Sequence, residues 1–217
     1  MAEYLDPYRK AVDRFGPGFE ATLWLSREKQ TLRFAVIASM VDLTDRVVVD
    51  AGCALGDFAA YLGSEGIRTR AYVGLEGVPE LVEEARGRGL PGARFELVDF
   101  VDRKDAFSHC LPKGLAPEIV VFSGSLNTLD QARALEVLDR AWRASEEAVV
   151  FNFLSNCHRP PGGPDPGPAK RFDPVEVLEW ALKRTPRVIL RQDYMCGHDA
   201  TVAMLKVDSE EGDGSAA

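Results

Sequence analysis

The fold is decided by one stretch of the sequence, Val47-Val48-Val49-Asp50-Ala51-Gly52-Cys53-Ala54-Leu55-Gly56. Its first three residues form a β-branched, continuously apolar run, which is typical of a parallel strand buried on both faces of a sheet. Gly52 and Gly56 permit a tight turn, and the apolar residues at 58–62 favour a helix directly after it. This order of strand, turn and helix predicts the first unit of an α/β fold.

The same alternation continues along the chain. Four more apolar runs predict strands, at residues 71–75, 94–98, 119–122 and 148–151. Apolar residues at helical spacing predict helices over 79–88 and 129–143. Short links between such elements imply parallel strands joined by right-handed crossovers, with helices on both faces of the sheet.

The C-terminal part departs from this alternation. A helix opens at Asp173-Pro174, and two strands follow at 187–190 and 201–205 with no helix between them. Because a short link cannot make a parallel crossover, these two strands should pair antiparallel. We therefore predict a mostly parallel seven-stranded sheet with one antiparallel strand and helices on both faces.

The first 45 residues are predicted to be a helical cap. A short helix over 4–15 should end at Gly16-Pro17-Gly18, and Ser26 is placed to cap a longer helix after it. The main domain is expected over 46–207. Residues 208–217 carry four acidic side chains and are predicted to be a disordered tail.

Composition places the chain among globular proteins. It has 217 residues, 46% of them hydrophobic and 28% charged, which suits one domain with a full core. No run of about 18 apolar residues indicates a membrane span, and the N-terminus lacks the pattern of a signal peptide, so a cytoplasmic protein is expected. Four cysteines lie far apart and are interpreted as reduced thiols.

Charge gives no sign of a nucleic-acid partner. The formal net charge is −8, of which the last ten residues contribute −4, and no run of Lys and Arg stands out. A small-molecule partner is therefore expected. The oligomeric state is left open.

Candidate ligand-binding residues follow three successive strands. In an open parallel sheet, ligands bind beyond the carboxyl ends of the strands. Gly52 and Gly56 let the backbone approach a ligand closely, and the carboxylate of Glu76 at the end of the second strand can accept hydrogen bonds from ribose hydroxyls. Asp99 ends the third strand and could accept from the exocyclic amine of adenine. Together these features favour a nucleoside site over plain strand ends.

The turn does not match the phosphate-binding fingerprints. A dinucleotide motif needs glycine at 52, 54 and 57, but 54 is Ala and 57 is Asp. The G-x-x-x-x-G-K-[ST] loop of nucleotide triphosphatases is also missing from the sequence. A nucleoside without phosphates fits better.

At this point the residues resemble the class I S-adenosylmethionine-dependent methyltransferases, whose D-x-G-x-G-x-G signature is similar to Asp50–Gly56 with Ala54 at the middle glycine. The resemblance covers roughly residues 46–207 and implies a Rossmann-like methyltransferase fold, S-adenosylmethionine as donor and S-adenosylhomocysteine as product. It implies that Glu76 holds the ribose, that Asp99 and Phe100 contact the adenine, and that the segment at Ser123 lines the methionine moiety. The donor-binding residues expected are Asp50, Gly52, Cys53, Gly56, Glu76, Gly77, Asp99, Phe100, Ser123 and Gly124.

A narrower resemblance points to a group of small bacterial methyltransferases with no settled substrate. It rests on the segments at 26–34, 56–58, 151–155 and 185–195. A bacterial source is also indicated by 19 Arg against 7 Lys. The function expected is transfer of a methyl group to a small-molecule acceptor, whose identity and reacting atom stay open.

The catalytic residue is unknown from the sequence. Methyl transfer is an in-line displacement that sometimes needs a base, and His158 is a weak candidate because it follows the fifth strand. It begins a loop over 155–171, rich in Pro and Gly, that could be a lid. His158 and Cys157 with His198 and Cys196 supply soft ligands, but their spacing matches no zinc motif, so no metal is expected.

Further residues could contact the donor or the acceptor, and two functions other than methyl transfer stay open. Trp24, Arg27 and Arg33 come from the region that could cover the donor, and an arginine there could hold the methionine carboxylate. Asn127 and Tyr194 could hydrogen-bond an acceptor. The alternative functions are an NAD-type Rossmann dehydrogenase and a non-catalytic binding protein related to the methyltransferases.

Overall fold

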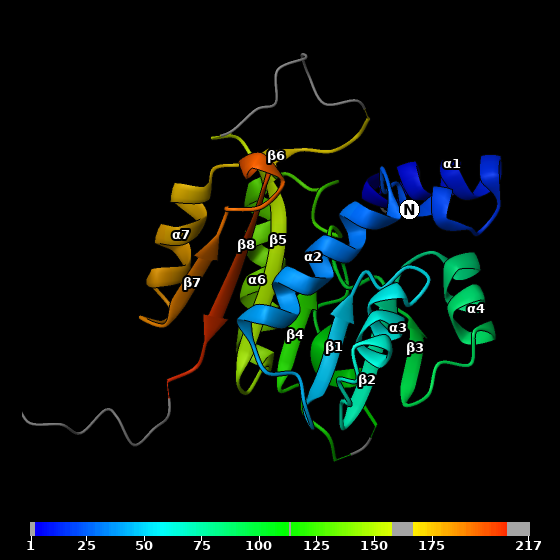
Figure 1. Cartoon of the computed structure of the whole chain (residues 1–217), viewed down its shortest axis with the longest axis horizontal. Coiled ribbons are helices and arrows are strands. Elements are labelled where there is room, and N and C mark those ends of the chain that lie inside the picture. The colour runs from blue at the N-terminus through cyan, green and yellow to red at the C-terminus, as the bar shows by residue number, and fades with distance from the viewer. Residues whose placement is uncertain (1–2, 113, 158–166, 208–217) are drawn as a thin grey trace, which may run out of the picture.

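A computed structural model of the chain, which describes residues 3–112, 114–157 and 167–207, has one central sheet (Figure 1). The strand order is β3-β2-β1-β4-β5-β8-β7, and a short strand β6 pairs with the end of β5 outside this path. The strands are β1 (Val47–Ala51), β2 (Ala71–Glu76), β3 (Ala93–Leu97), β4 (Ile119–Phe122), β5 (Ala148–Ser155), β6 (Arg171–Phe172), β7 (Val188–Arg191) and β8 (Asp199–Leu205).

The pairing directions agree with the sequence-based prediction. Strands β1 to β5 pair in parallel, whereas β8 runs antiparallel to both of its neighbours, β5 and β7. The seven predicted strands and the single antiparallel one are therefore confirmed. Strand β6 is an addition that the sequence did not predict, because two residues carry no periodic signal.

Helices cover both faces of the sheet. They are α1 (Asp6–Phe15), α2 (Arg27–Met40), α3 (Asp57–Ser64), α4 (Pro79–Gly87), α5 (Ala106–His109), α6 (Gln131–Ala144) and α7 (Pro174–Leu182), with 3-10 turns η1 (Glu3–Leu5), η2 (Phe19–Thr22) and η3 (Met195–Gly197). In Figure 1, α2 and α3 lie in front of the sheet, and α6 lies behind it. The apolar side chains of α2 and α3 cluster with one face of β1 and β4, and those of α6 cluster with the other face, whereas α7 packs on β7 and β8.

Side-chain caps begin three of these helices. Ser26 Oγ accepts from the backbone N–H of Lys29, as predicted, and Asp173 Oδ1 accepts from Val175 at the start of α7. Asp130 Oδ1 accepts from the N–H of Arg133 at 2.9 Å. Because Asp130 is this cap, α6 begins at Gln131 and not at residue 129 as the apolar spacing predicted.

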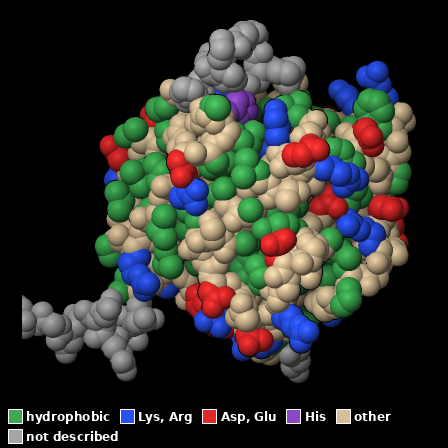
Figure 2. Space-filling view, viewed as in Figure 1, with side chains coloured by type: hydrophobic (Ala, Val, Ile, Leu, Met, Phe, Trp, Pro, Cys, Tyr) green, Lys and Arg blue, Asp and Glu red, His purple; other side chains and the backbone are tan. Residues whose placement is uncertain are grey.

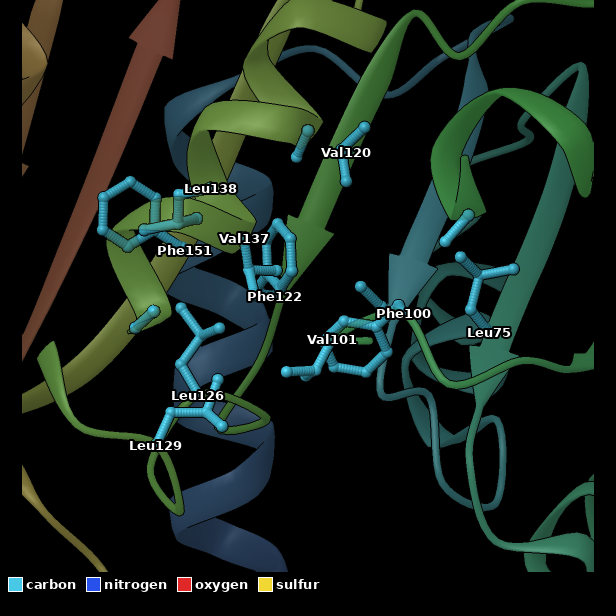
Figure 3. Close-up of a cluster of buried hydrophobic side chains, with 14 of the residues drawn as sticks. Leu75, Phe100, Val101, Val120, Phe122, Leu126, Leu129, Val137, Leu138 and Phe151 are labelled. Atoms are coloured by element: carbon cyan, nitrogen blue, oxygen red, sulfur yellow. The ribbon is translucent and has the colours of Figure 1, made fainter. Parts of the chain in front are cut away.

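The core between the sheet and α6 is aromatic (Figure 3). Phe100, Phe122 and Phe151 are each at most 3% exposed, and the rings of Phe100 and Phe122 meet edge to face at 5.9 Å between centroids. Val137 and Leu138 of α6 close this cluster from the other side. The ring of Phe100 is thereby held firmly at the carboxyl end of the sheet.

The surface in the same orientation mixes charges of both signs. Figure 2 shows acidic and basic side chains interspersed over this face with apolar ones between them. Among the described helices, none is long and apolar enough to cross a membrane.

The N-terminal segment lies above the carboxyl ends of the strands, where α1 is seen beside the end of α2 in Figure 1. A buried ion pair fastens α2 to the sheet: Nε of Arg33 donates to Oδ2 of Asp199, the first residue of β8. The two side chains are only 6% and 1% exposed. This contact fixes the middle of α2 against the start of β8.

Breaking that pair should destabilise the protein strongly. We expect Arg33→Met to lower the free energy of unfolding by about 3–5 kcal/mol, because it leaves the Asp199 carboxylate buried without its cation. Urea denaturation of both proteins measures the difference. Arg94→Met is the matched control: Arg94 is 61% exposed in its pair with Glu96, and its loss should change stability by about 0–1 kcal/mol. Equal effects of the two substitutions would contradict the assigned role of Arg33.

Candidate functional site

A pocket opens at the carboxyl ends of β1, β2 and β4, beneath the N-terminal segment. The space within it is about 820 Å³, a figure that includes the open mouth. The lining residues are Tyr4, Leu5, Tyr8, Thr22, Leu23, Trp24, Gly52, Ala54, Glu76, Phe100, Ser123, Gly124, Ser125, Asn127, Thr128, Pro168 and Ala169.

The turn after β1 forms the floor of the pocket. Gly52 has φ +82°, and a Cβ there would lie 2.3 Å from Cβ of Ser125, so only glycine fits. The N–H groups of Gly52 and Cys53 both donate to the carbonyl of Leu75, at 2.7 and 3.1 Å. The N–H of Gly56 donates to the carbonyl of Cys53. These donors are thus used within the protein and do not form an open cradle for a phosphate.

Ala54 occupies the position of the middle glycine in a strained conformation. Its φ is +46°, in the left-handed region that residues with a Cβ avoid. Its N–H donates to Oε2 of Glu76 at 3.0 Å. The replacement of glycine by alanine is therefore accommodated by backbone strain, and a hydrogen bond to Glu76 holds the turn in place.

The carboxylate of Glu76 accepts three backbone hydrogen bonds in this site. Besides the bond from Ala54, Oε1 accepts from the N–H groups of Gly77 and Val78 at 2.8 and 2.9 Å. Burial raises the pKa of Glu76, and the three N–H donors act against that rise. A carboxylate has about four lone-pair sites. With three of them used, Glu76 has room for one further donor and not for two.

A second buried acid, Asp50, lies behind the turn and outside the pocket lining. Its Oδ2 accepts from the hydroxyl of Tyr72, whereas Oδ1 has no partner among the described residues. Burial raises the pKa of Asp50 to about 7, and the charges of Glu76 and Asp57 add to the rise. The thiol of Cys53 is buried on the same side, and burial raises its pKa as well.

Asp99 and Phe100 follow the third predicted strand, and only the second of them lines the pocket. Oδ1 of Asp99 accepts from the N–H groups of Val101 and Asp102 and from the hydroxyl of Tyr4 at 2.5 Å. Asp99 thereby shapes its own turn and binds the N-terminal segment, whereas Phe100 lines the pocket.

The segment after β4 forms the opposite wall. Gly124 has φ +72°, and a Cβ there would lie 2.7 Å from the indole ring of Trp24, so the indole packs directly on this backbone. Ser123 Oγ and Asn127 Oδ1 are buried and have no hydrogen-bond partner in the described part of the chain. Since buried polar atoms are normally paired, these two atoms are candidates for ligand contacts.

The structure brings together half of the residues predicted for the donor site. Gly52, Glu76, Phe100, Ser123 and Gly124 line the pocket, and the others, Asp50, Cys53, Gly56, Gly77 and Asp99, do not. A Cβ at Gly56, where φ is +73°, would meet the ring of Phe95, so this glycine is required by packing and by backbone conformation, whereas a Cβ at Gly77 would meet the end of the Leu5 side chain.

Sequence reasoning missed the N-terminal part of the pocket. Tyr4, Tyr8, Thr22 and Leu23 line it together with Trp24. Burial raises the pKa of the Tyr4 and Tyr8 hydroxyls, so both stay neutral. The available signal was the spacing of the two tyrosines, four residues apart on one face of a predicted helix.

Several other predicted residues lie elsewhere. Arg33 does not line the pocket, because it pairs with Asp199 and its guanidinium lies 4.6 Å from the centroid of the Trp24 ring. The guanidinium of Arg27 lies over Phe19. The hydroxyl of Tyr194 is buried against Thr201, at 2.7 Å.

The predicted base and the possible lid are not covered by the structure. His158 and most of the 155–171 loop lie outside the described residues, although Pro168 and Ala169, at the end of that loop, line the pocket. The acidic tail at 208–217 lies outside them too. Within the described ranges, no three His, Cys, Asp or Glu side chains are grouped so that they could hold a metal ion.

The charge of the pocket is distinctive. Glu76 is a carboxylate, and the described residues that line the pocket include no Lys, Arg or His. Such a lining suits a ligand with net positive charge and opposes one that carries phosphates.

No protein-family model matches the chain, and no curated protein matches it either. Solved structures do match. The complex named DhpI-SAM-HEP shares 13% identity with a TM-score of 0.67, over 95% of this chain and 100% of that one. An O-methyltransferase family protein from Burkholderia thailandensis shares 15% identity with a TM-score of 0.68, over 93% and 62%.

A third match is magnesium protoporphyrin IX methyltransferase from Synechocystis PCC 6803 with bound SAH, at 15% identity and a TM-score of 0.59, over 82% of this chain and 83% of that one. At these identities the likeness is one of fold. The chain has the Rossmann-like fold of the S-adenosylmethionine-dependent methyltransferases, as the sequence predicted.

Relief of the strain at Ala54 should stabilise the protein. We expect Ala54→Gly to raise the free energy of unfolding by up to about 1.5 kcal/mol, because the left-handed conformation costs alanine about 1–2 kcal/mol and glycine loses about 0.5–1 kcal/mol of backbone entropy in exchange. Chemical denaturation measures the change. Ala59→Gly in α3 is the control with the opposite sign, expected to lower stability by about 1 kcal/mol. A loss of stability in Ala54→Gly would contradict the strain.

Asp50 should make folding depend on pH. Its pKa is raised from 3.8 to about 7 by burial, so the folded state binds more protons than the unfolded one between these values, and stability falls as pH rises through that window. Asp50→Asn removes this term. Its stability relative to wild type should rise by on the order of 1 kcal/mol for each pH unit between about pH 4 and 7, and level off above.

Urea denaturation of wild type and Asp50→Asn at several pH values tests this. The exposed Asp13 in α1 is the control, and Asp13→Asn should track wild type throughout. A stability difference that does not change with pH would rule out the raised pKa of Asp50.

Proposed function

We propose that this protein transfers a methyl group from S-adenosylmethionine to a small-molecule acceptor. The observation that carries the proposal is the pocket at the carboxyl ends of β1, β2 and β4, with its carboxylate and no cation among the described lining residues. S-adenosylmethionine carries a net positive charge, and its nucleoside half has no phosphate, so it suits this lining. NAD carries a pyrophosphate, whereas the N–H groups of Gly52, Cys53, Ala54 and Gly56 already have acceptors within the protein, and the described lining residues include no cation.

The pocket residues fit the donor part by part. The remaining lone pair of Glu76 would accept one ribose hydroxyl, and the ring of Phe100 would pack against the adenine. Ser123 Oγ and Asn127 Oδ1, which are buried without partners in the described part of the chain, would bond the methionine half. The resemblance also implied contacts from Asp50, Cys53, Gly56, Gly77 and Asp99. We propose instead that these five support the walls.

When bound, the donor supplies an electrophilic methyl group on a sulfonium sulfur. The chain's own residues would orient it and exclude water. Trp24 on Gly124, and Leu5 on Gly77, close the N-terminal segment over the site. The structural neighbours that carry SAM or SAH in their names support the same donor.

We also propose that the protein works in the cytoplasm of a bacterial cell and without a nucleic-acid partner. The four cysteines are free thiols, which suits the reducing cytoplasm of a bacterial cell. The interspersed surface charge in Figure 2 gives no continuous basic track for nucleic acid on that face.

Calorimetric titration with S-adenosylmethionine, S-adenosylhomocysteine and NADH tests the proposal. We expect the first two to bind and NADH not to bind. Glu76→Ala should weaken donor binding by about 1.5–3 kcal/mol, the usual contribution of a hydrogen bond to a charged group. Because it also deprives three backbone N–H groups of their acceptor, the melting temperature of each variant is measured alongside.

Ser123→Ala separates the loss of donor binding from the loss of stability, which Glu76→Ala combines. Ser123 Oγ has no partner among the described residues, so this substitution should weaken donor binding without a loss of stability. Binding of NADH alone would favour the dehydrogenases. Binding of none of the three, by a folded protein, would favour a non-catalytic relative.

A further inference from the structure

Two of the four cysteines are exposed, although free cysteine is ordinarily among the most buried residue types. Cys53 is buried and Cys110 is half-buried, whereas Cys157 and Cys196 are both exposed. Neither exposed cysteine is among the described residues that line the pocket. The methyl transfer proposed above gives these two thiols no part, so their position calls for a separate explanation.

The pairing of β5 with β8 brings the two exposed cysteines to the same end of the sheet. The two strands are antiparallel along their whole contact. This contact continues one residue further, because the N–H of Ser155 donates to the carbonyl of His198 at 3.0 Å. Counted onward from there, the second residue after Ser155 is Cys157, and the second residue before His198 is Cys196. The cysteines therefore occupy matching positions just beyond the paired strands.

A side chain from the turn between β7 and β8 connects the two backbones. Nε2 of Gln192 donates to Ser155 Oγ at 2.9 Å and to the carbonyl of Gly197, the neighbour of Cys196, at 3.0 Å. The same Ser155 Oγ accepts from the N–H of Cys157 at 3.1 Å. Figure 1 shows this turn, in orange, beside the end of β5. Three hydrogen bonds in series thus link Cys157 to the residue that follows Cys196.

Both cysteines lie outside the strands. β5 ends at Ser155 and β8 begins at Asp199, so a movement of either cysteine would not break the pairing of the sheet. A disulfide requires Cα atoms about 4.4–6.8 Å apart. A shift of the turn toward the end of β5 can meet this requirement while β5 and β8 stay in place.

The backbone at Cys196 is strained. Met195, Cys196 and Gly197 have consecutive φ angles of +49°, +54° and +74°, and the first two carry a Cβ. Left-handed backbone at such residues persists only where surrounding contacts maintain it, and it clusters at functional sites. Glycine would adopt the conformation at position 196 without this strain. A cysteine there is therefore explained better by the chemistry of its side chain than by the needs of the turn.

The end of β5 also holds the part of the chain that lines the pocket. Strand β6 pairs with the last two residues of β5, and the N–H of Asn156 donates to the carbonyl of Phe172 at 2.9 Å. The residues at 168–169, shortly before β6, line the pocket. A covalent bond at Cys157 would therefore form next to the strand that positions this part of the wall.

We propose that Cys157 and Cys196 form a redox-modification site, in which a disulfide oxidant such as oxidised glutathione joins them in an intramolecular disulfide. The proposal does not depend on the identity of the methyl donor. The disulfide would be transient in a reducing cytoplasm and would form under oxidative conditions, as is usual for redox-sensing cysteines of cytosolic proteins.

The chemistry is an exchange in two steps. The thiolate of one cysteine attacks a sulfur of oxidised glutathione, and one glutathione thiolate leaves. The second cysteine loses its proton and attacks the protein sulfur of the mixed disulfide, and the second glutathione leaves. The two protein thiols give up two electrons and two protons in total, which convert one molecule of oxidised glutathione into two of the reduced form.

Incubation of the full-length protein with oxidised glutathione tests the proposal. The remaining thiols are then alkylated, and tryptic peptides are analysed by mass spectrometry without reduction. Trypsin leaves each of the four cysteines on a separate peptide, so the bond can be assigned. We expect one bond, between Cys157 and Cys196 of the same chain. The melting temperature should rise by about 5–15 °C, because the bond closes a long loop in the unfolded chain, and dithiothreitol should reverse the rise.

Single serine variants provide the controls. Cys157→Ser and Cys196→Ser should form no disulfide within the chain and should carry one glutathione on the cysteine that remains exposed. Both should melt like the reduced wild type, because the replaced side chains are exposed. Cys110→Ser is the matched control, and it should form the bond between Cys157 and Cys196 as wild type does.

Three results would overturn the proposal. The first is glutathione on both exposed cysteines of wild type with no bond between them. The second is a disulfide that joins two copies of the chain, which non-reducing electrophoresis detects. The third is a bond that lowers the melting temperature, since it would then form only by distorting the fold.

Discussion

The carboxylate of Glu76 ties together the two crossover turns on which the pocket depends. It stands at the end of β2 and accepts the N–H of Ala54 from the turn after β1 and those of Gly77 and Val78 from its own turn. A buried carboxylate with these three donors is stabilised as an anion in a place where burial alone would favour its neutral form. The negative charge of the pocket and the shape of its floor therefore have the same origin.

The second constraint is the closure of the pocket by segments distant in sequence. Glycine backbones at 77 and 124 receive the side chains of Leu5 and Trp24, where a Cβ would collide with them. The buried pair of Arg33 and Asp199 fixes α2 against β8 and holds the guanidinium over the same indole. The wall of the pocket, α2 and the turn that carries His198 are thus parts of one packed arrangement. We expect that a change in any of them is transmitted to the others, because interiors are close-packed.

Local patterns were sufficient for most of the fold. Val47, Val48 and Val49 are all apolar because β1 is covered on both faces, and the antiparallel β8 follows from a link too short for a crossover. The observed start of a helix differs from the predicted one where a side chain caps the helix, as Asp130 does at the start of α6. Among the site residues, Gly52 and Glu76 could be predicted because they stand at strand ends, and strand ends in a parallel sheet converge on one edge.

The sequence by itself determined the class of fold, the direction of every predicted strand and the edge of the sheet where a ligand would bind, since these follow from periodicity and link length. Only the tertiary structure decided which side chains face the pocket. Asp50 and Cys53 belong to the same motif as Gly52, yet they do not face the pocket, because both side chains are buried against β2, where Asp50 bonds the hydroxyl of Tyr72 and Cys53 lies against Gly74. Tyr4, Tyr8 and Trp24 reach the pocket, and Arg33 meets Asp199, through contacts between segments far apart in the chain. Such contacts have no local signature, because they arise from the packing of whole elements.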